Sequence, residues 1–312
     1  ISFVDNGLSI NYMHNIMLYP LLFLHNKLPL TLKFLPEVYA IESDSDISGI
    51  IVVSPRSFNK KIEIEKLYSK EELNSCIPDL IQFVVSKYKA MGALSVIIKV
   101  DTCLSELVEM LVAKCNFTQI SSEKLWYVGQ FNNIEYDKYM FRRFENSDAQ
   151  NVAEIYNESL LPHFRPLLSK QSDDFREKVF KGLINYDEYQ YVLDSSDTNS
   201  IIGYLSIKTY DEISYVVDFV QTNVVEFDIR EIISFAVNQI RKRNKNFELY
   251  IKSKRYIYCG EKNEKLCADA GFKIVKDSFV LTNSSAKILK NTEKSCRYLA
   301  IESFYPSRAV QI

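Results

Sequence analysis

Apolar and polar positions follow two alternating periods along the second half of the chain. The strand-like run "MFRRF" at residues 140–144 precedes a segment with apolar residues at helical spacing. A corner rich in proline and a second helical segment at residues 173–183 come next, then three strand-like runs, "YQYVLD", "SIIGYLSIKTY" and "EISYVVDFVQ". The helix "DIREIISFAVNQIRKRN", the strand "FELYIKS", the helix "EKNEKLCADAG" and the strand "FKIVKDSFVLT" complete the half. These patterns predict the order β-α-α-β-β-β-α-β-α-β.

The first half repeats this order from residue 37 onward. Strands "EVYAIES", "SGIIVVS" and "KIEIEKLY" precede the helix "IPDLIQFVVSKYKAMG", the strand "ALSVIIKV", the helix "LSELVEMLVAKC" and the strand "FTQISSEKLWYVG". The last helix of each half is followed by Asn116-Phe117 or Gly271-Phe272. Because Asn and Gly tolerate the left-handed backbone that ends a helix, both pairs predict the same helix end.

The repeat predicts two tandem α/β domains, each a mixed sheet with helices on both faces. Residues 129–137, "GQFNNIEYD", are polar and lack periodicity, so they mark the expected boundary. We therefore expect an N-terminal domain at residues 1–130 and a C-terminal domain with an extension at residues 138–312.

Composition narrows the classes of partner. The chain has 312 residues, 47% of them hydrophobic, which is enough for two cores. Its 38 basic and 40 acidic residues give a net charge of -2, which offers no long-range attraction to nucleic acid or to an anionic membrane. The six cysteines form no CxxC pair, so we expect a reducing, cytoplasmic setting. No metal-ligand spacing is present, and nothing in the sequence sets the oligomeric state.

The run "RRFENSDAQNVAEIYNE" and the helix end "LCADAGF" resemble the GNAT acyltransferase superfamily, and their repetition resembles its tandem members. The resemblance covers residues 35–130 and 138–283. It implies a donor, acetyl-CoA or another acyl-CoA, whose thioester lies between splayed fourth and fifth strands, and a small amine as acceptor. The expected function is an acyl-CoA-dependent N-acyltransferase; the alternative is a non-catalytic GNAT-like module that binds a small molecule or a protein.

The acyl-CoA motif is degenerate in both halves. In the family, a glycine-rich loop after the fourth strand presents N–H groups to the pyrophosphate at a helix start, but no glycine occurs at residues 67–78 or 222–230. The resemblance places the donor in the second half, against Val220, Gln221, Phe227, Asp228, Ile229 and Arg230. Carboxylates at this helix start, among them Glu226 and Asp228, have a competing use as helix caps, and they would repel a pyrophosphate.

The resemblance also assigns acid, base and acceptor residues. Cys267 stands where the family often places a tyrosine that protonates the thiolate, although a packed, buried thiol is the alternative. Asp218 on the fourth strand is the candidate general base, with Glu65 as its first-half counterpart, and a plain strand carboxylate is the alternative. In the corner between the first two helices, His163 and Arg165 are candidates for binding the acceptor, against the alternative of an ordinary surface loop.

Overall fold

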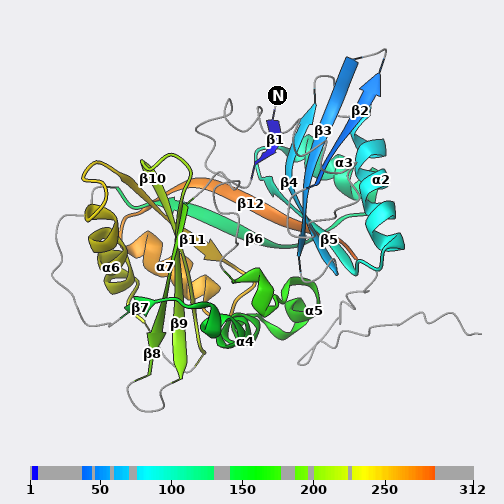
Figure 1. Ribbon diagram of the computed structural model, residues 1–312. Helices are drawn as coiled ribbons and strands as arrows, with labels where there is room; N and C mark the ends of the chain where they lie inside the picture. The colour runs from blue at the N-terminus through cyan, green and yellow to red at the C-terminus, as the bar shows by residue number, and fades with distance from the viewer. Residues whose placement is uncertain are drawn as a thin grey trace, which may run out of the picture.

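The structure is a computed structural model that describes residues 2–5, 37–43, 46–56, 60–69, 76–129, 141–176, 187–195, 200–223 and 227–284. Its described strands form one 12-stranded mixed sheet that runs through both halves (Figure 1). The strand order is β2-β3-β4-β5-β12-β6-β11-β10-β9-β8-β7, and β1 pairs with β4 off this path.

The elements follow the order that the sequence predicts. The first half contains β1 (Ser2–Asp5), β2 (Glu37–Ser43), β3 (Asp46–Arg56), β4 (Lys61–Ser69), α2 (Ile77–Ala90), β5 (Ser95–Asp101), α3 (Ser105–Cys115) and β6 (Thr118–Tyr127). The second contains β7 (Phe141–Arg143), η1 (Asn146–Asp148), α4 (Ala149–Ser159), η2 (Pro162–Phe164), α5 (Arg165–Leu168), η3 (Ser172–Asp174), β8 (Asp187–Asp194), β9 (Ile201–Thr209), β10 (Ser214–Gln221), α6 (Ile229–Arg241), β11 (Glu248–Lys254), α7 (Gly260–Asp269) and β12 (Lys273–Ser284). Of the helix expected at residues 173–183, the described part forms only the end of η3, and the rest lies outside the described residues.

The two halves exchange their last strands. Strand β12 of the second half lies between β5 and β6 of the first, and β6 in turn pairs with β11 of the second half. Each half's sheet is therefore completed by a strand of the other, which the sequence pattern does not predict. The boundary proposed between residues 130 and 138 falls outside the described residues, and the division into domains stays a prediction.

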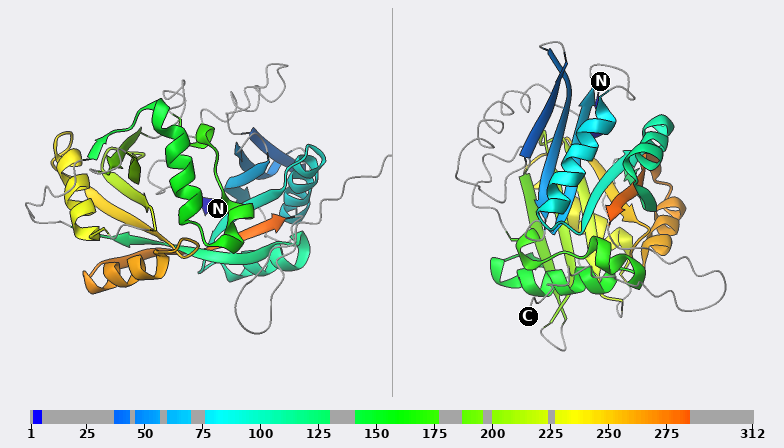
Figure 2. Two further views of the ribbon diagram at one scale, coloured as in Figure 1. Left: turned by 90° about the horizontal axis from the view of Figure 1, so that it is seen from below. Right: turned by 90° about the vertical axis from the view of Figure 1, so that its right-hand side faces the viewer.

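Helices cover both faces of the shared sheet. On β5, Val96 and Ile98 pack beneath α2 and α3, whereas Ile97 points to the other face and packs beneath α4. On β6, Trp126 packs beneath α6 and α7, on the same face as α2 and α3. The helix α4 and the corner after it thus lie across the middle of the opposite face, over strands of both halves (Figure 2).

Both predicted helix ends are confirmed. Asn116 has φ 55° and ψ 35°, in the left-handed region, and Gly271 has φ 78°. The first of these ends is also closed from the other half, because Asn283 of β12 donates a 2.7 Å hydrogen bond to the carbonyl of Cys115.

We expect Asn116→Ala to lower the free energy of unfolding by about 1 kcal/mol, because alanine is strained in the left-handed backbone. Asn116→Gly should leave stability equal or slightly higher, since glycine adopts this conformation freely. Urea unfolding of both variants tests this, and equal losses for Ala and Gly would contradict it.

Among the described residues, no helix has both the length and the apolar character needed to span a bilayer.

Candidate active site

Each half contains a fork where two parallel strands separate. Strands β10 and β11 pair from Ser214 to Val217 and then diverge. Strands β4 and β5 do the same after Ile64. The first residue beyond the paired segment is Asp218 in one half and Glu65 in the other, so these two carboxylates occupy equivalent positions.

The chain itself fills the fork of the first half. Strand β1 pairs antiparallel with residues 66–68 of β4, directly beyond the fork. Because β3 pairs with the same residues on the opposite edge of β4, β1 must lie on the edge that faces β5. In the second half, no strand among those the structure describes pairs with β10 beyond Val217 on its β11 side. Among the described residues, the first fork is thus occupied by a strand, and the second has an unpaired strand edge.

An ion pair crosses the open fork. Asp218 accepts hydrogen bonds of 2.7 and 2.6 Å from the ammonium of Lys254, a side chain that is only 6% exposed. Burial alone would raise the pKa of Asp218, but the charges of Lys254 and Lys252 and the hydrogen bond outweigh it and hold that pKa below its ordinary value. A carboxylate tied to an ammonium in this way is a weak proton acceptor, so the geometry favours a positioning role for Asp218 over the expected role of general base.

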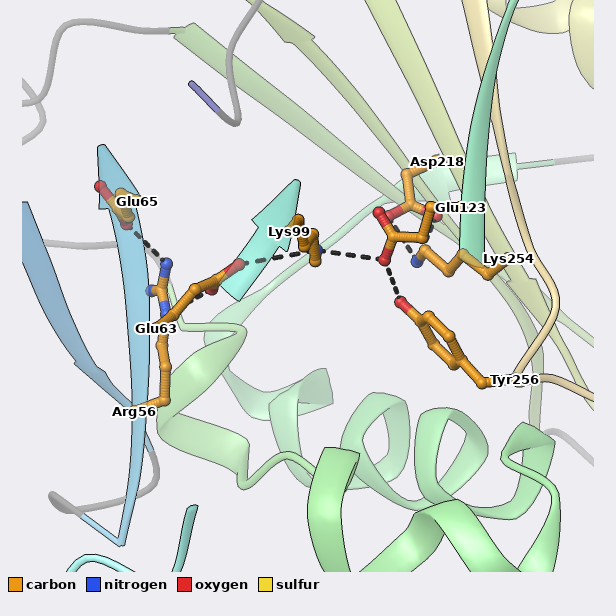
Figure 3. A network of polar contacts seen from close by, with 8 residues as sticks. All are labelled: Arg56, Glu63, Glu65, Lys99, Glu123, Asp218, Lys254 and Tyr256. Carbon is orange, nitrogen blue, oxygen red and sulfur yellow. Dashed lines mark hydrogen bonds and ion pairs between the residues drawn. The ribbon is translucent and has the colours of Figure 1, made fainter. Parts of the chain in front are cut away.

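Beside this ion pair, further polar contacts extend through the first half, on the face of the sheet that α4 covers (Figure 3). Lys99 of β5 binds Glu123 of β6 at 3.1 Å and Glu63 of β4 at 3.5 Å. Tyr256 donates a hydrogen bond to Glu123, and Arg56 contacts Glu63. We call this set, with Glu65, Asp218 and Lys254, the central polar network. It connects β4, β5 and β6 across β12, the second-half strand that lies between β5 and β6.

Burial and charge act against each other throughout the network. Burial disfavours the charged form of Glu63, but Lys99 and Arg56 lower its pKa to about 2. Burial likewise opposes the charge on Lys99, yet Glu123 and Glu63 raise the pKa of its ammonium above the ordinary value. Water still reaches the middle of the network, because the Glu63 and Lys99 side chains are each 22% exposed and that of Asp218 is 25% exposed. The network is thus charged, desolvated and accessible from one side, which suits a polar ligand.

The corner after α5 is fixed against this face of the sheet. The ammonium of Lys61, on β4, donates to the carbonyl of Ser169 at 2.5 Å and to its hydroxyl at 2.6 Å. Asn157 of α4 then holds the next residue, Lys170, by two 2.8 Å hydrogen bonds: its Oδ1 accepts from the Lys170 N–H, and its Nδ2 donates to the Lys170 carbonyl. A first-half strand therefore anchors a second-half corner beside the open fork.

The expected acceptor residues lie at this corner but are engaged locally. The guanidinium of Arg165 donates to the carbonyls of Leu160 and Glu158, at 3.2 Å each, and so caps the end of α4. His163 lies with its ring centroid 3.9 Å from that of Phe164. These contacts favour a structural role for Arg165.

The expected donor residues divide by burial. Val220, Phe227 and Ile229 are core side chains, so only their main chain could contact a ligand. The amide of Gln221 donates to the Cys259 sulfur at 3.2 Å. Asp228 is the N-cap of α6 and accepts a 2.9 Å hydrogen bond from the N–H of Arg230. The capping alternative is confirmed for Asp228, whereas Glu226 lies outside the described residues.

The expected acid, Cys267, is fully buried in the core beneath α6. Burial raises the pKa of its thiol to about 12. A thiol this weakly acidic is a poor proton donor to a thiolate with an ordinary pKa of about 8.5, so its environment fits the packed-thiol alternative.

Comparison with solved structures identifies the architecture. A tandem GNAT protein from the clavulanic acid biosynthesis pathway superposes with a TM-score of 0.56 at 9% identity, over 80% of this chain and 83% of that one. The chain has a tandem GNAT fold. A GCN5-related N-acetyltransferase from Sphaerobacter thermophilus matches with a TM-score of 0.52 at 9% identity, over 77% of this chain and 78% of that one. A conserved protein of unknown function from Enterococcus faecalis V583 matches with a TM-score of 0.51 at 9% identity, over 88% of this chain and 71% of that one. No family model and no curated protein matches the sequence.

The tandem GNAT fold places the two forks at the fourth and fifth strands of each half, as the resemblance implies. The resemblance placed Asp218 on the fourth strand, where the fork lies, but it did not identify Lys254, Lys170 and Glu123. A signal was present for Lys254, since Tyr250, Lys252 and Lys254 alternate along β11 and share one face. Glu123 and Lys170 come close to the fork only through tertiary contacts, and no local pattern identifies them.

Proposed function

We propose that the protein is an acyl-CoA-dependent N-acyltransferase that works at the β10–β11 fork and acts on a small amine. The observation that carries this proposal is the contrast between the forks. One is filled by β1, whereas no described strand pairs along the edge of the other, which has Asp218 and Lys254 at its start. An open edge of this kind can pair with the amide-bearing arm of an acyl-CoA as it would with another strand.

The second half fits the thioester end of an acyl-CoA better than its pyrophosphate end. The fork suits the thioester end, because the β10 edge is open there and a cation is in place. The start of α6 suits the pyrophosphate less well, since Asp228 already accepts from the N–H of Arg230 and adds a negative charge. We therefore assign the thioester end to the fork.

The chain's own residues then have separate tasks. Lys254 places a positive charge in a desolvated position, where it stabilises negative charge developing on an acyl oxygen. Asp218 holds that ammonium in position by two hydrogen bonds. The corner at Ser169 and Lys170 borders the fork on the acceptor side and is held in place by Lys61 and Asn157.

A matched pair of variants tests the proposal. We expect acetyl-CoA to bind in calorimetric titration, and Asp218→Asn to lower kcat/KM for thiol release in the presence of amines by about 100-fold, because the ammonium at the fork loses its carboxylate. Glu65→Gln, at the equivalent position of the filled fork, should change kcat/KM by less than about threefold.

Three results would count against the proposal. Equal effects of the two variants would exclude the second fork as the site. Heat of binding without thiol release from any amine would leave a binding protein. Absence of heat from the wild-type chain would favour the non-catalytic module.

A further inference from the structure

Lys170 differs from the other lysines near the fork in what surrounds its ammonium. Its Nζ lies 4.6 Å from the ring centroid of Tyr156 and 5.3 Å from that of Phe175. No carboxylate or other hydrogen-bond acceptor contacts this Nζ in the part of the chain that the structure describes. By contrast, Lys254 binds Asp218 and Lys61 binds Ser169.

A second lysine approaches the same aromatic ring. The Nζ of Lys254 is 5.7 Å from the Tyr156 centroid, so two ammonium groups share one tyrosine, and the carboxylate of Asp218 is bound to Lys254. The charged groups that face Lys170 are Lys254 on β11, Asp218 on β10, Lys208 on β9 and Glu63 on β4, together with the phenol of Tyr156.

Burial and the neighbouring ammonium of Lys254 favour the neutral amine of Lys170. Burial, followed by the charge of Lys254, lowers the pKa of Lys170 to about 7, against the weaker opposing effects of Asp218 and Glu63. The two hydrogen bonds between Asn157 and the main chain of Lys170 fix that main chain, and Lys61 fixes the residue before it. The side chain is partly exposed. Lys170 therefore combines a held position, access and a neutral amine, which are the requirements for a nucleophilic lysine.

We propose that Lys170 is a modification site at which the protein takes an acyl group from a thioester on its own side chain. The Nζ lone pair attacks the thioester carbonyl carbon and forms the C–N bond. The C–S bond breaks, the thiolate leaves, and the proton lost by the amine goes to that thiolate, which becomes the free thiol. The products are an ε-N-acyl-lysine and a free thiol, and the step needs no other reactant. The assignment of acyl-CoA as the natural donor rests on the proposed function; the reactivity of Lys170 does not.

Acylation of Lys170 would change the fork. It replaces an amine that shares Tyr156 with Lys254 by a neutral amide that is larger by the acyl group. The corner on the acceptor side then loses both its titratable amine and its space, so we expect the acylated protein to transfer acyl groups more slowly. The modification is thus a means of self-inhibition by the donor.

The test uses the full chain and the small thioester S-acetyl-N-acetylcysteamine, which does not need a CoA site, with peptide mass spectrometry over time at pH 7.5. We expect Lys170 to be acetylated at least about tenfold faster than the exposed Lys245, because a far larger fraction of its amine is neutral. The rate at Lys170 should rise through about pH 7 and level off above about pH 8. Lys170→Arg has no nucleophilic amine and should abolish the fast site, and Asn157→Ala should slow it.

A parallel reaction with acetyl-CoA separates the two proposals. Acetylation of Lys170 by both donors supports both. Acetylation by the small thioester but not by acetyl-CoA retains the reactive lysine and contradicts the proposed function. Faster acetylation of Lys252 or Lys254, equal rates at Lys170 and Lys245, or a rate at Lys170 that still climbs at pH 10 would each overturn the reactive lysine.

Discussion

Glu123→Ala is expected to lower the free energy of unfolding by about 3 kcal/mol, near the lower end of the cost of removing one partner from a buried ion pair. The Glu123 side chain is 6% exposed and lies 3.1 Å from the ammonium of Lys99. It also accepts a hydrogen bond from the hydroxyl of Tyr256. In the variant, Lys99 still has Glu63 at 3.5 Å as a partner. We therefore expect less than the full cost of leaving a buried charge without a partner. Urea unfolding at neutral pH measures the loss.

The pH dependence of this loss has a definite sign. Burial opposes the charge on Glu123, but Lys99, Lys252 and Lys254 and the hydrogen bond from Tyr256 hold the pKa of its carboxyl well below the ordinary value. The stabilisation is therefore fully present above the unfolded-state pKa of about 4.3 and is lost as the pH falls through the folded-state pKa. The difference between wild type and Glu123→Ala should shrink in acid.

Two further variants locate the source of the loss. Glu65→Ala removes a carboxylate of the same network that is 27% exposed and paired with Arg56, and it should cost less than about 1 kcal/mol. Adding Lys99→Met to Glu123→Ala should regain part of the stability, because the orphaned ammonium is then gone. A loss from Glu123→Ala no larger than that from Glu65→Ala would show that the network does not stabilise the join between the halves.

Gly260→Ala should be at least as damaging, at about 3 kcal/mol, because it overpacks a contact between two stretches of backbone. A Cβ at residue 260 would lie 2.1 Å from the carbonyl oxygen of Lys254 and 3.0 Å from the Cα of Arg255. Neither atom belongs to a side chain that can rotate away, so either the start of α7 or the end of β11 must move. Since β11 ends at Lys254, the change should also impair any activity that depends on the fork.

Gly92→Ala is the matched control for this prediction. Gly92 has φ 92°, but a Cβ there would meet no atom within 4 Å, so its cost is that of backbone strain alone, about 1 kcal/mol. Urea unfolding of both variants gives the comparison. Equal costs would mean that the approach of Gly260 to β11 is not a tight contact.

Local patterns predicted the elements and their order well, because the periodicity of β5, α3 and β10 is set by which face each buries. The helix ends at Asn116 and Gly271 were predictable for a different reason: the left-handed backbone that ends a helix selects Asn or Gly. The position of Asp218 followed from the element order. The pairing of Asp218 with Lys254 could not be predicted from that order, because it depends on how β10 and β11 diverge.

The features that the sequence did not predict depend on pairing between strands that are far apart in the sequence. The pattern of "FTQISSEKLWYVG" predicts a strand but does not say that β6 will lie between two strands of the other half. Glu123 and Lys99 meet across β12, which belongs to the second half. The filling of the first fork by β1 involves four residues, too few for any periodicity. Tertiary contact alone decides such features.

The exchange of β6 and β12 also has a consequence during synthesis. Strand β5 emerges from the ribosome early, yet its neighbour in the finished sheet is β12, the last strand that the structure describes. Until β12 is made, one edge of β5 remains without its native partner, and such edges recruit other chains. The pairing of β5 with β12 joins segments far apart in the sequence. Such pairing is slow, because the entropy of the intervening loop is lost before the contacts form. Chaperones that shield exposed strand edges would therefore be most useful to this protein while its second half is still being translated.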